Sequence, residues 1–142
     1  QAKLLASAYM RSGQYDKAET TCLTMLDLIN AVFKDESYTP PFHLEQPLYR
    51  FLAICALKNK NEPQAVRYLE KMYEYTLGQA KGFQKNMYVK TPLLETRKMD
   101  FNYPYYEPQK MMLNEMEKEC FKVLLKNEDF LQLKEKVMNL QE

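Results

Sequence analysis

The sequence predicts an all-α fold made of tightly packed helical hairpins, with about six helices. Only 3 glycines occur in 142 residues, so few positions favour the end of a helix. Leu, Met, Lys, Glu, Gln and Ala are frequent, and these residues have high intrinsic helix propensity. Apolar residues also recur at spacings of three and four, which is the period of a helix that buries one face.

Composition and charge exclude several classes of function. The chain is 46% hydrophobic and 27% charged, values typical of a globular protein, and its length predicts a single domain over residues 1–142. Its 20 basic and 19 acidic residues give a net charge of +1, so we expect no direct nucleic-acid binding by this segment. The longest apolar run, residues 51–57, is far below the roughly 20 residues that cross a bilayer, so no membrane span is expected.

The cysteines and the start of the chain indicate the compartment and the context. Cys22, Cys55 and Cys120 are odd in number and lack metal-type spacing, and no basic-then-apolar leader opens the chain. A cytoplasmic location fits these features best. Helical periodicity begins at Leu4, directly after Gln1, and we infer a fragment of a longer protein.

The first half of the chain predicts two helical hairpins. The first comprises helices over 2–12 and 15–33, separated by Gly13, which can take the left-handed conformation that stops a helix. Two consecutive prolines make residues 34–43 a loop. The second hairpin comprises helices over 46–58 and 62–79, with Pro63 in the first turn of the latter.

The second half predicts an aromatic connection and a C-terminal helix pair. Residues 82–106 lack helical periodicity and are rich in Tyr and Phe, so we expect a long segment laid against the helices. A helix over 108–126 and a last helix reaching 141, capped by Asn127, complete the chain. The expected buried residues of this pair are Met112, Leu113, Met116, Cys120, Leu124, Phe130, Leu133, Val137 and Leu140.

The two hairpins repeat one another at a fixed interval of 47 residues. The residues Leu5, Ala6, Tyr9, Gly13, Ala18, Cys22 and Met25 correspond to Leu52, Ala53, Ala56, Lys60, Ala65, Leu69 and Met72. The small alanines at equivalent places would let the two helices of each hairpin approach closely, while the larger residues fill the space between hairpins.

This pattern resembles the tetratricopeptide repeat, which has a Leu-Gly/Ala pair, a Tyr, a turn Gly, an Ala and a bulky residue at the same internal spacings. Repeat one would span about 2–33 and repeat two about 46–79. The family period is about 34 residues, so the interval of 47 implies a longer second helix and an inserted loop. Lys60 replaces the usual turn Gly.

A second similarity concerns the C-terminal half. The segments Lys90–Leu94, Phe121–Leu124 and Asn127–Phe130 resemble the tail of the helical-repeat region in Firmicute-type helix-turn-helix transcriptional regulators. That resemblance implies a sensor or oligomerisation domain of a cytoplasmic regulator, with a homodimer among the possible assemblies. A free-standing tetratricopeptide adaptor or scaffold protein is the alternative.

The sequence contains no motif that predicts catalysis or a cofactor. His43 is the only histidine, and all three cysteines fall on apolar helix stripes, where thiols are usually inert. Glu115, Glu117 and Glu119 alternate along one helix and are expected to be solvated. We therefore expect no enzyme activity, no metal and no cofactor.

A protein or peptide is the expected ligand, because stacked hairpins form a concave face from the first helix of each hairpin. The residues expected on that face are Lys3, Ser7, Met10, Arg11, Arg50, Ile54, Leu57 and Lys58. Four of the eight are basic, which favours an acidic peptide. A solvated basic face without a ligand remains the alternative.

Overall fold

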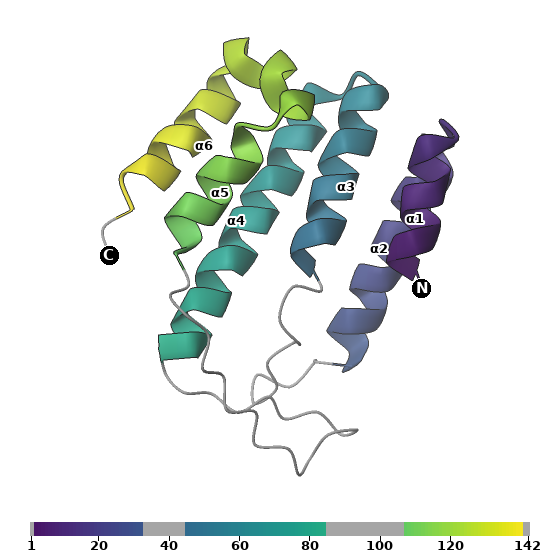
Figure 1. Cartoon of the computed structure of the whole chain (residues 1–142), viewed down its shortest axis with the longest axis horizontal. Helices are drawn as coiled ribbons and strands as arrows, with labels where there is room; N and C mark the ends of the chain where they lie inside the picture. The colour runs from purple at the N-terminus through teal and green to yellow at the C-terminus, as the bar shows by residue number, and fades with distance from the viewer. Residues whose placement is uncertain (1, 33–44, 85–106, 141–142) are drawn as a thin grey trace.

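The computed structural model describes residues 2–32, 45–84 and 107–140, and every regular element in these ranges is helical. The elements are α1 (Ala2–Arg11), α2 (Tyr15–Val32), α3 (Glu45–Lys58), α4 (Glu62–Gln84), α5 (Pro108–Met116), the 3-10 helix η1 (Glu119–Lys126) and α6 (Glu128–Met138). They form a row with the α1–α2 hairpin at one end and α6 at the other (Figure 1). The predicted all-α fold is confirmed.

The turns of the two hairpins are built alike. In both, three consecutive amides bond back to the carbonyls of the preceding helix: Ser12, Gly13 and Gln14 to Ala8, Met10 and Tyr9, and Asn59, Lys60 and Asn61 to Cys55, Leu57 and Ala56. Gly13 has φ +73° and Lys60 has φ +57°, so both turns use the left-handed conformation. For Gly13 this conformation was predicted, whereas Lys60 adopts it despite its side chain.

Small residues lie where the helices of each hairpin meet. Ala6, Ala18, Ala53 and Ala65 are all fully buried, as the sequence pattern predicted. Around them are two groups of buried side chains. One joins α1, α2 and α3 through Cys22, Leu26, Ile29, Leu48 and Leu52, and the other joins α3 and α4 to the C-terminal helices.

Equivalent leucines of the two hairpins differ in burial. Leu52 is completely buried because α3 packs on α2, whereas Leu5, its counterpart in α1, is 47% exposed. No helix among the described residues covers the Leu5 side of α1. The repeat therefore predicted that Leu5 lies in a helix, as Leu52 does, but it did not predict how exposed the Leu5 side chain is.

The predicted helix over 108–126 is wrong, because α5 ends at Met116 and Lys118 is extended, with ψ 148°. Residues 119–126 then form η1. With three residues per turn, η1 places Phe121 and Leu124 on its buried side and leaves Cys120 exposed, so the expected burial of Cys120 is also wrong.

The ends of the other helices mostly follow the expected signals. The Asn127 side chain caps α6 by accepting a hydrogen bond from the Phe130 amide at 3.0 Å, as predicted. Helix α4 continues to Gln84, past the expected end near Gln79. The loop 34–43 with His43, and the aromatic connection apart from the end of α4, lie outside the described residues.

Candidate functional site

The predicted binding surface lies on α1 and α3, the first helices of the two hairpins, which contact each other. On α1, Lys3 and Arg11 are exposed, and Ser7 and Met10 are half-buried. On α3, only Lys58 is exposed, while Arg50, Ile54 and Leu57 are half-buried. The eight residues thus lie on two helices that contact each other, but they differ in their access to a ligand.

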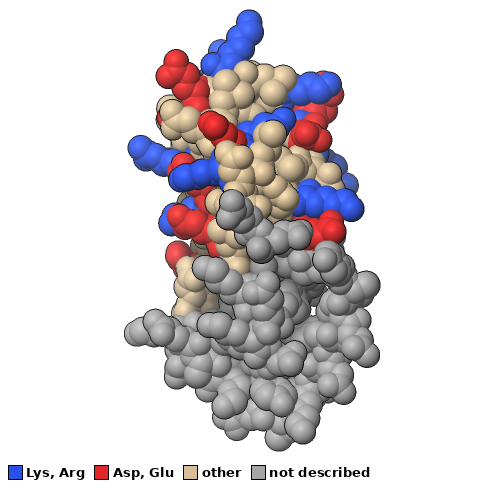
Figure 2. Space-filling view, turned by 90° about the vertical axis from the view of Figure 1, so that its left-hand side faces the viewer, with Lys and Arg blue, Asp and Glu red and all other residues tan. Residues whose placement is uncertain are grey.

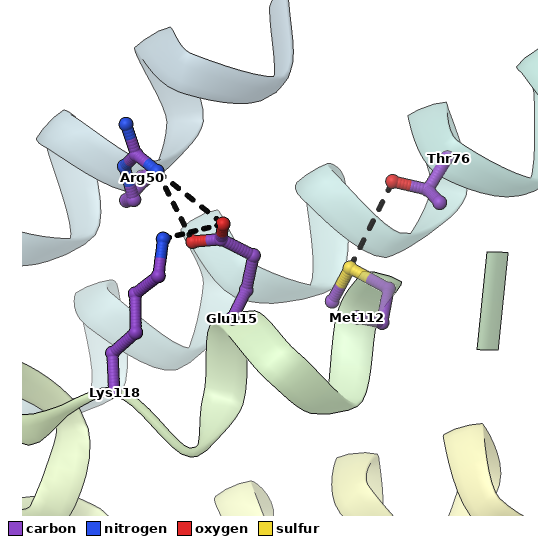
Figure 3. Close-up of polar contacts among 5 residues, drawn as sticks. All are labelled: Arg50, Thr76, Met112, Glu115 and Lys118. Atoms are coloured by element: carbon purple, nitrogen blue, oxygen red, sulfur yellow. Dashed lines mark hydrogen bonds and ion pairs between the residues drawn. The ribbon is translucent and has the colours of Figure 1, made fainter. Parts of the chain in front are cut away.

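Arg50 is engaged inside the molecule. Its Nη1 lies 3.3 Å from Oε1 and 3.4 Å from Oε2 of Glu115 on α5 (Figure 3). Its guanidinium carbon lies 5.6 Å from the centre of the Phe51 ring. The Arg50 side chain is 27% exposed and that of Glu115 is 16% exposed. Much of the charge of Arg50 is therefore balanced within the chain.

The expectation that Glu115 is solvated is wrong. Besides Arg50, Lys118 donates to Glu115 Oε1 at 2.6 Å from the turn between α5 and η1 (Figure 3). One carboxylate thus connects α3 to two successive parts of the C-terminal region. The Arg50–Glu115 pair could not be predicted from spacing, because 65 residues separate its members.

Ile54 and Leu57 have a structural role. Both pack against the buried group that includes Val66, Met112 and Phe121. Because part of each side chain is covered by this buried group, less of its apolar area is open to a peptide.

The cations that remain available are Lys3, Arg11 and Lys58. None of the three forms an ion pair with any described residue, and all are exposed. They differ in this respect from Lys71 of α4, which pairs with Glu74 at 2.8 Å. An acidic ligand on this surface would be held chiefly by these three side chains.

Acidic residues of α2 connect the two hairpins rather than binding a ligand. Tyr68 donates to Glu19 Oε1 at 3.1 Å, and the Asn59 amide nitrogen donates to Asp16 Oδ1 at 3.3 Å. These contacts connect α2 to the second hairpin.

The buried thiols of Cys22 and Cys55 lie between the same two hairpins. Burial, with the nearby Cys55 and Glu19 charges, raises the pKa of Cys22 to about 12. Burial and the charges of Glu19 and Asp16 raise the pKa of Cys55 to about 11. Both thiols stay protonated near neutral pH, and a protonated thiol is a poor nucleophile and metal ligand.

The C-terminal pair is held together by its apolar stripe. Phe130, Leu133 and Val137 of α6 are buried within the chain, so these three side chains pack against other helices of the same molecule. Thr76 of α4 donates to the Met72 carbonyl at 2.7 Å and lies 3.8 Å from the sulfur of Met112 (Figure 3). This contact joins α4 to α5.

The described residues form neither a metal-binding group nor a membrane-spanning helix. Within the described ranges, no group of three or more His, Cys, Asp or Glu side chains could hold a metal ion. No described helix combines the length and apolar character required to span a bilayer. Comparison with known proteins adds no lead, since no family model, curated protein or solved structure matches this chain.

Proposed function

We propose that this chain is a protein-binding module built from helical repeats of the tetratricopeptide type. The observation that carries the proposal is the correspondence of the two hairpins, which share turn hydrogen bonds, left-handed turn residues and buried alanines at an interval of 47 residues. Stacked hairpins place their first helices on a common surface that is suited to an extended or helical peptide. The contact between α1 and α3 supports this arrangement.

The proposed ligand is a protein segment that carries carboxylates among apolar residues. Exposed Lys3, Arg11 and Lys58 would attract the carboxylates. Half-buried Met10 offers an adaptable apolar contact between them. A ligand with both features would use the surface better than a purely charged one.

The experiment is a fluorescence titration with labelled peptides in which acidic and apolar residues alternate. Lys58→Glu should weaken binding, because it removes an attractive charge and adds a repulsive one on the proposed surface. Lys71→Glu is the matched control, since it makes the same charge change at an exposed position of α4 away from the proposed surface. Circular dichroism must first show equal helix content in both variants. Equal affinity of the wild type and both variants would refute the proposed surface.

Arg50→Glu is not a suitable test of binding. It would place a carboxylate beside the half-buried Glu115, with only Lys118 left to balance the two. A loss of binding in this variant would therefore not separate a damaged fold from a damaged surface.

We further propose that the module serves as the sensor or oligomerisation domain of a cytoplasmic transcriptional regulator, with a free-standing adaptor as the second candidate. The support for the first is the resemblance of residues 90–94 and 121–130 to the tail of such regulators. The sequence of the intact protein distinguishes the two. A helix-turn-helix DNA-binding domain ahead of residue 1 favours the regulator, whereas further repeats and no such domain favour the adaptor.

A further inference from the structure

We propose that the 142-residue chain self-associates head to tail, with the outer face of α6 in one molecule packed on the outer face of α1 in the next. The proposed occupant of the α1 face, which no described helix covers, is a second copy of this chain. This inference rests on the oligomerisation role proposed above, but its apolar contacts involve none of the residues expected to bind a peptide.

The outer face of α1 is apolar and exposed. Leu4 is 71% exposed and Leu5 is 47% exposed, and Ala8 and Arg11 continue the same face at helical spacing. At the interval of 47 residues, Leu4, Leu5 and Ala8 correspond to Phe51, Leu52 and Cys55. Phe51 and Leu52 belong to the group of side chains that packs α3 on α2, the second helix of the preceding hairpin, and Cys55 lies near Cys22 of α2. The outer face of α1 therefore has the residue pattern of a surface on which the second helix of another hairpin packs.

The outer face of α6 is the complementary surface. Leu131 is 45% exposed and Met138 is 58% exposed, and Glu128 and Glu135 lie on the same side of the helix. The α6 end of the molecule, turned toward the viewer in Figure 2, shows uncharged side chains between acidic and basic ones. This end lies opposite α1–α2 in the row of helices (Figure 1).

Continuity and charge both favour α6 as the partner of α1. Within the chain, α2 packs on α3 and α4 packs on α5. In both cases the second helix of one hairpin packs on the first helix of the following helix pair. Placing α6 on α1 of another molecule, antiparallel, continues this order. It brings Glu128 toward Arg11 and Met138 toward Leu4 and Leu5, so that opposite charges and apolar groups meet.

The two faces are different, so the contact is heterologous. Each molecule that joins leaves one α1 face and one α6 face open, and association continues beyond the dimer. This distinguishes the proposal from a symmetric dimer, in which one face meets its own copy and growth stops at two molecules.

The experiment is sedimentation velocity on the 142-residue chain over a wide range of concentration. The wild type should form dimers and larger species as concentration rises. Leu5→Glu and Met138→Glu should each weaken self-association by at least about tenfold, because each would bury a charge in an apolar contact. Leu23→Glu is the control, since Leu23 is 40% exposed on α2 and lies on neither face.

Mixing the two variants gives the decisive measurement. Leu5→Glu keeps its α6 face and Met138→Glu keeps its α1 face, so an equal mixture should form a dimer and nothing larger. The proposal is overturned if the wild type is monomeric at every concentration, if the mixture stays monomeric, or if Leu23→Glu has the same effect as Leu5→Glu. Peptide titration at a concentration where the chain is monomeric tests the binding function separately.

Discussion

The two hairpins share one design but occupy different surroundings. Their turns have the same hydrogen bonds, and their alanines are equally buried. Yet α3 packs on a preceding hairpin, whereas no described helix covers the corresponding face of α1. Leu52 of α3 is 0% exposed, whereas its counterpart Leu5 of α1 is 47% exposed. In a stacked array the repeat determines the shape of a hairpin, and the neighbouring hairpin determines what each position contributes to stability.

The largest expected effect comes from truncating these two leucines. Leu52→Ala should lower the free energy of unfolding by about 2–5 kcal/mol, because it leaves a cavity between α2 and α3. Leu5→Ala should change it by less than about 0.5 kcal/mol, as expected for a surface position. Urea denaturation of dilute protein, monitored by circular dichroism, measures both.

Concentration provides the control for that comparison. If Leu5 becomes covered through self-association, Leu5→Ala should lower stability in concentrated protein but not in dilute protein. A large effect of Leu5→Ala in dilute, monomeric protein would show that the two leucines are equivalent and would remove the contrast.

The second prediction concerns what the hairpins have in common. Ala18→Leu and Ala65→Leu should each lower stability by about 1–3 kcal/mol, because both alanines are fully buried where paired helices approach closely. The denaturation midpoints of the two variants should shift by similar amounts. If Ala18→Leu were harmless while Ala65→Leu were not, the hairpins would differ in their internal packing as well as in their surroundings.

Sequence alone predicted the features that depend on local chemistry. Gly13 marks the first turn because a residue without Cβ adopts positive φ at little cost. The Ala6 and Ala18 positions follow from helical period, and Asn127 follows from the preference for Asn at helix N-termini. Each signal lies within a few residues of the structure it specifies.

Features that depend on distant contacts were not predictable in this way. The expected helix over 108–126 is interrupted after Met116. Its second part is a 3-10 helix with three residues per turn, and the α-helical spacing of the apolar residues did not predict this change. The Glu115 pair with Arg50 joins residues 65 positions apart, which no spacing rule covers. For the candidate site, sequence predicted which helices carry it but not which of its cations are already paired.

The third prediction sharpens the contrast between Arg50 and its counterpart in α1. Lys3 precedes Arg50 by 47 residues and is exposed, with no ion pair to any described residue, whereas Arg50 shares Glu115 with Lys118. Glu115→Gln should lower stability by about 1 kcal/mol, because a half-buried guanidinium loses its charged partner. Lys3→Gln should have no measurable effect.

Salt dependence checks the cause of that difference. High ionic strength should reduce the gap in stability between the wild type and Glu115→Gln only in part, because the pair is half-buried and salt screens such pairs less than exposed ones. An effect that disappears entirely in salt would instead indicate an ordinary surface charge.

The smallest expected effect lies in the turns, where the equivalent residues should respond with opposite sign. Gly13→Ala should lower stability by about 0.5–1 kcal/mol, since it introduces a Cβ at φ +73°. Apart from Gly13 and its two chain neighbours, no described atom lies within 4 Å of the position a Cβ would take, so backbone conformation alone would be responsible. Lys60→Gly should raise stability by roughly 0.5 kcal/mol, because it relieves a side chain held at φ +57°. Thermal and urea unfolding of both variants would measure the shifts. If Lys60→Gly destabilised the protein, contacts of the lysine side chain would have to outweigh the strain of its backbone, and the two turns would be equivalent in geometry but not in energy.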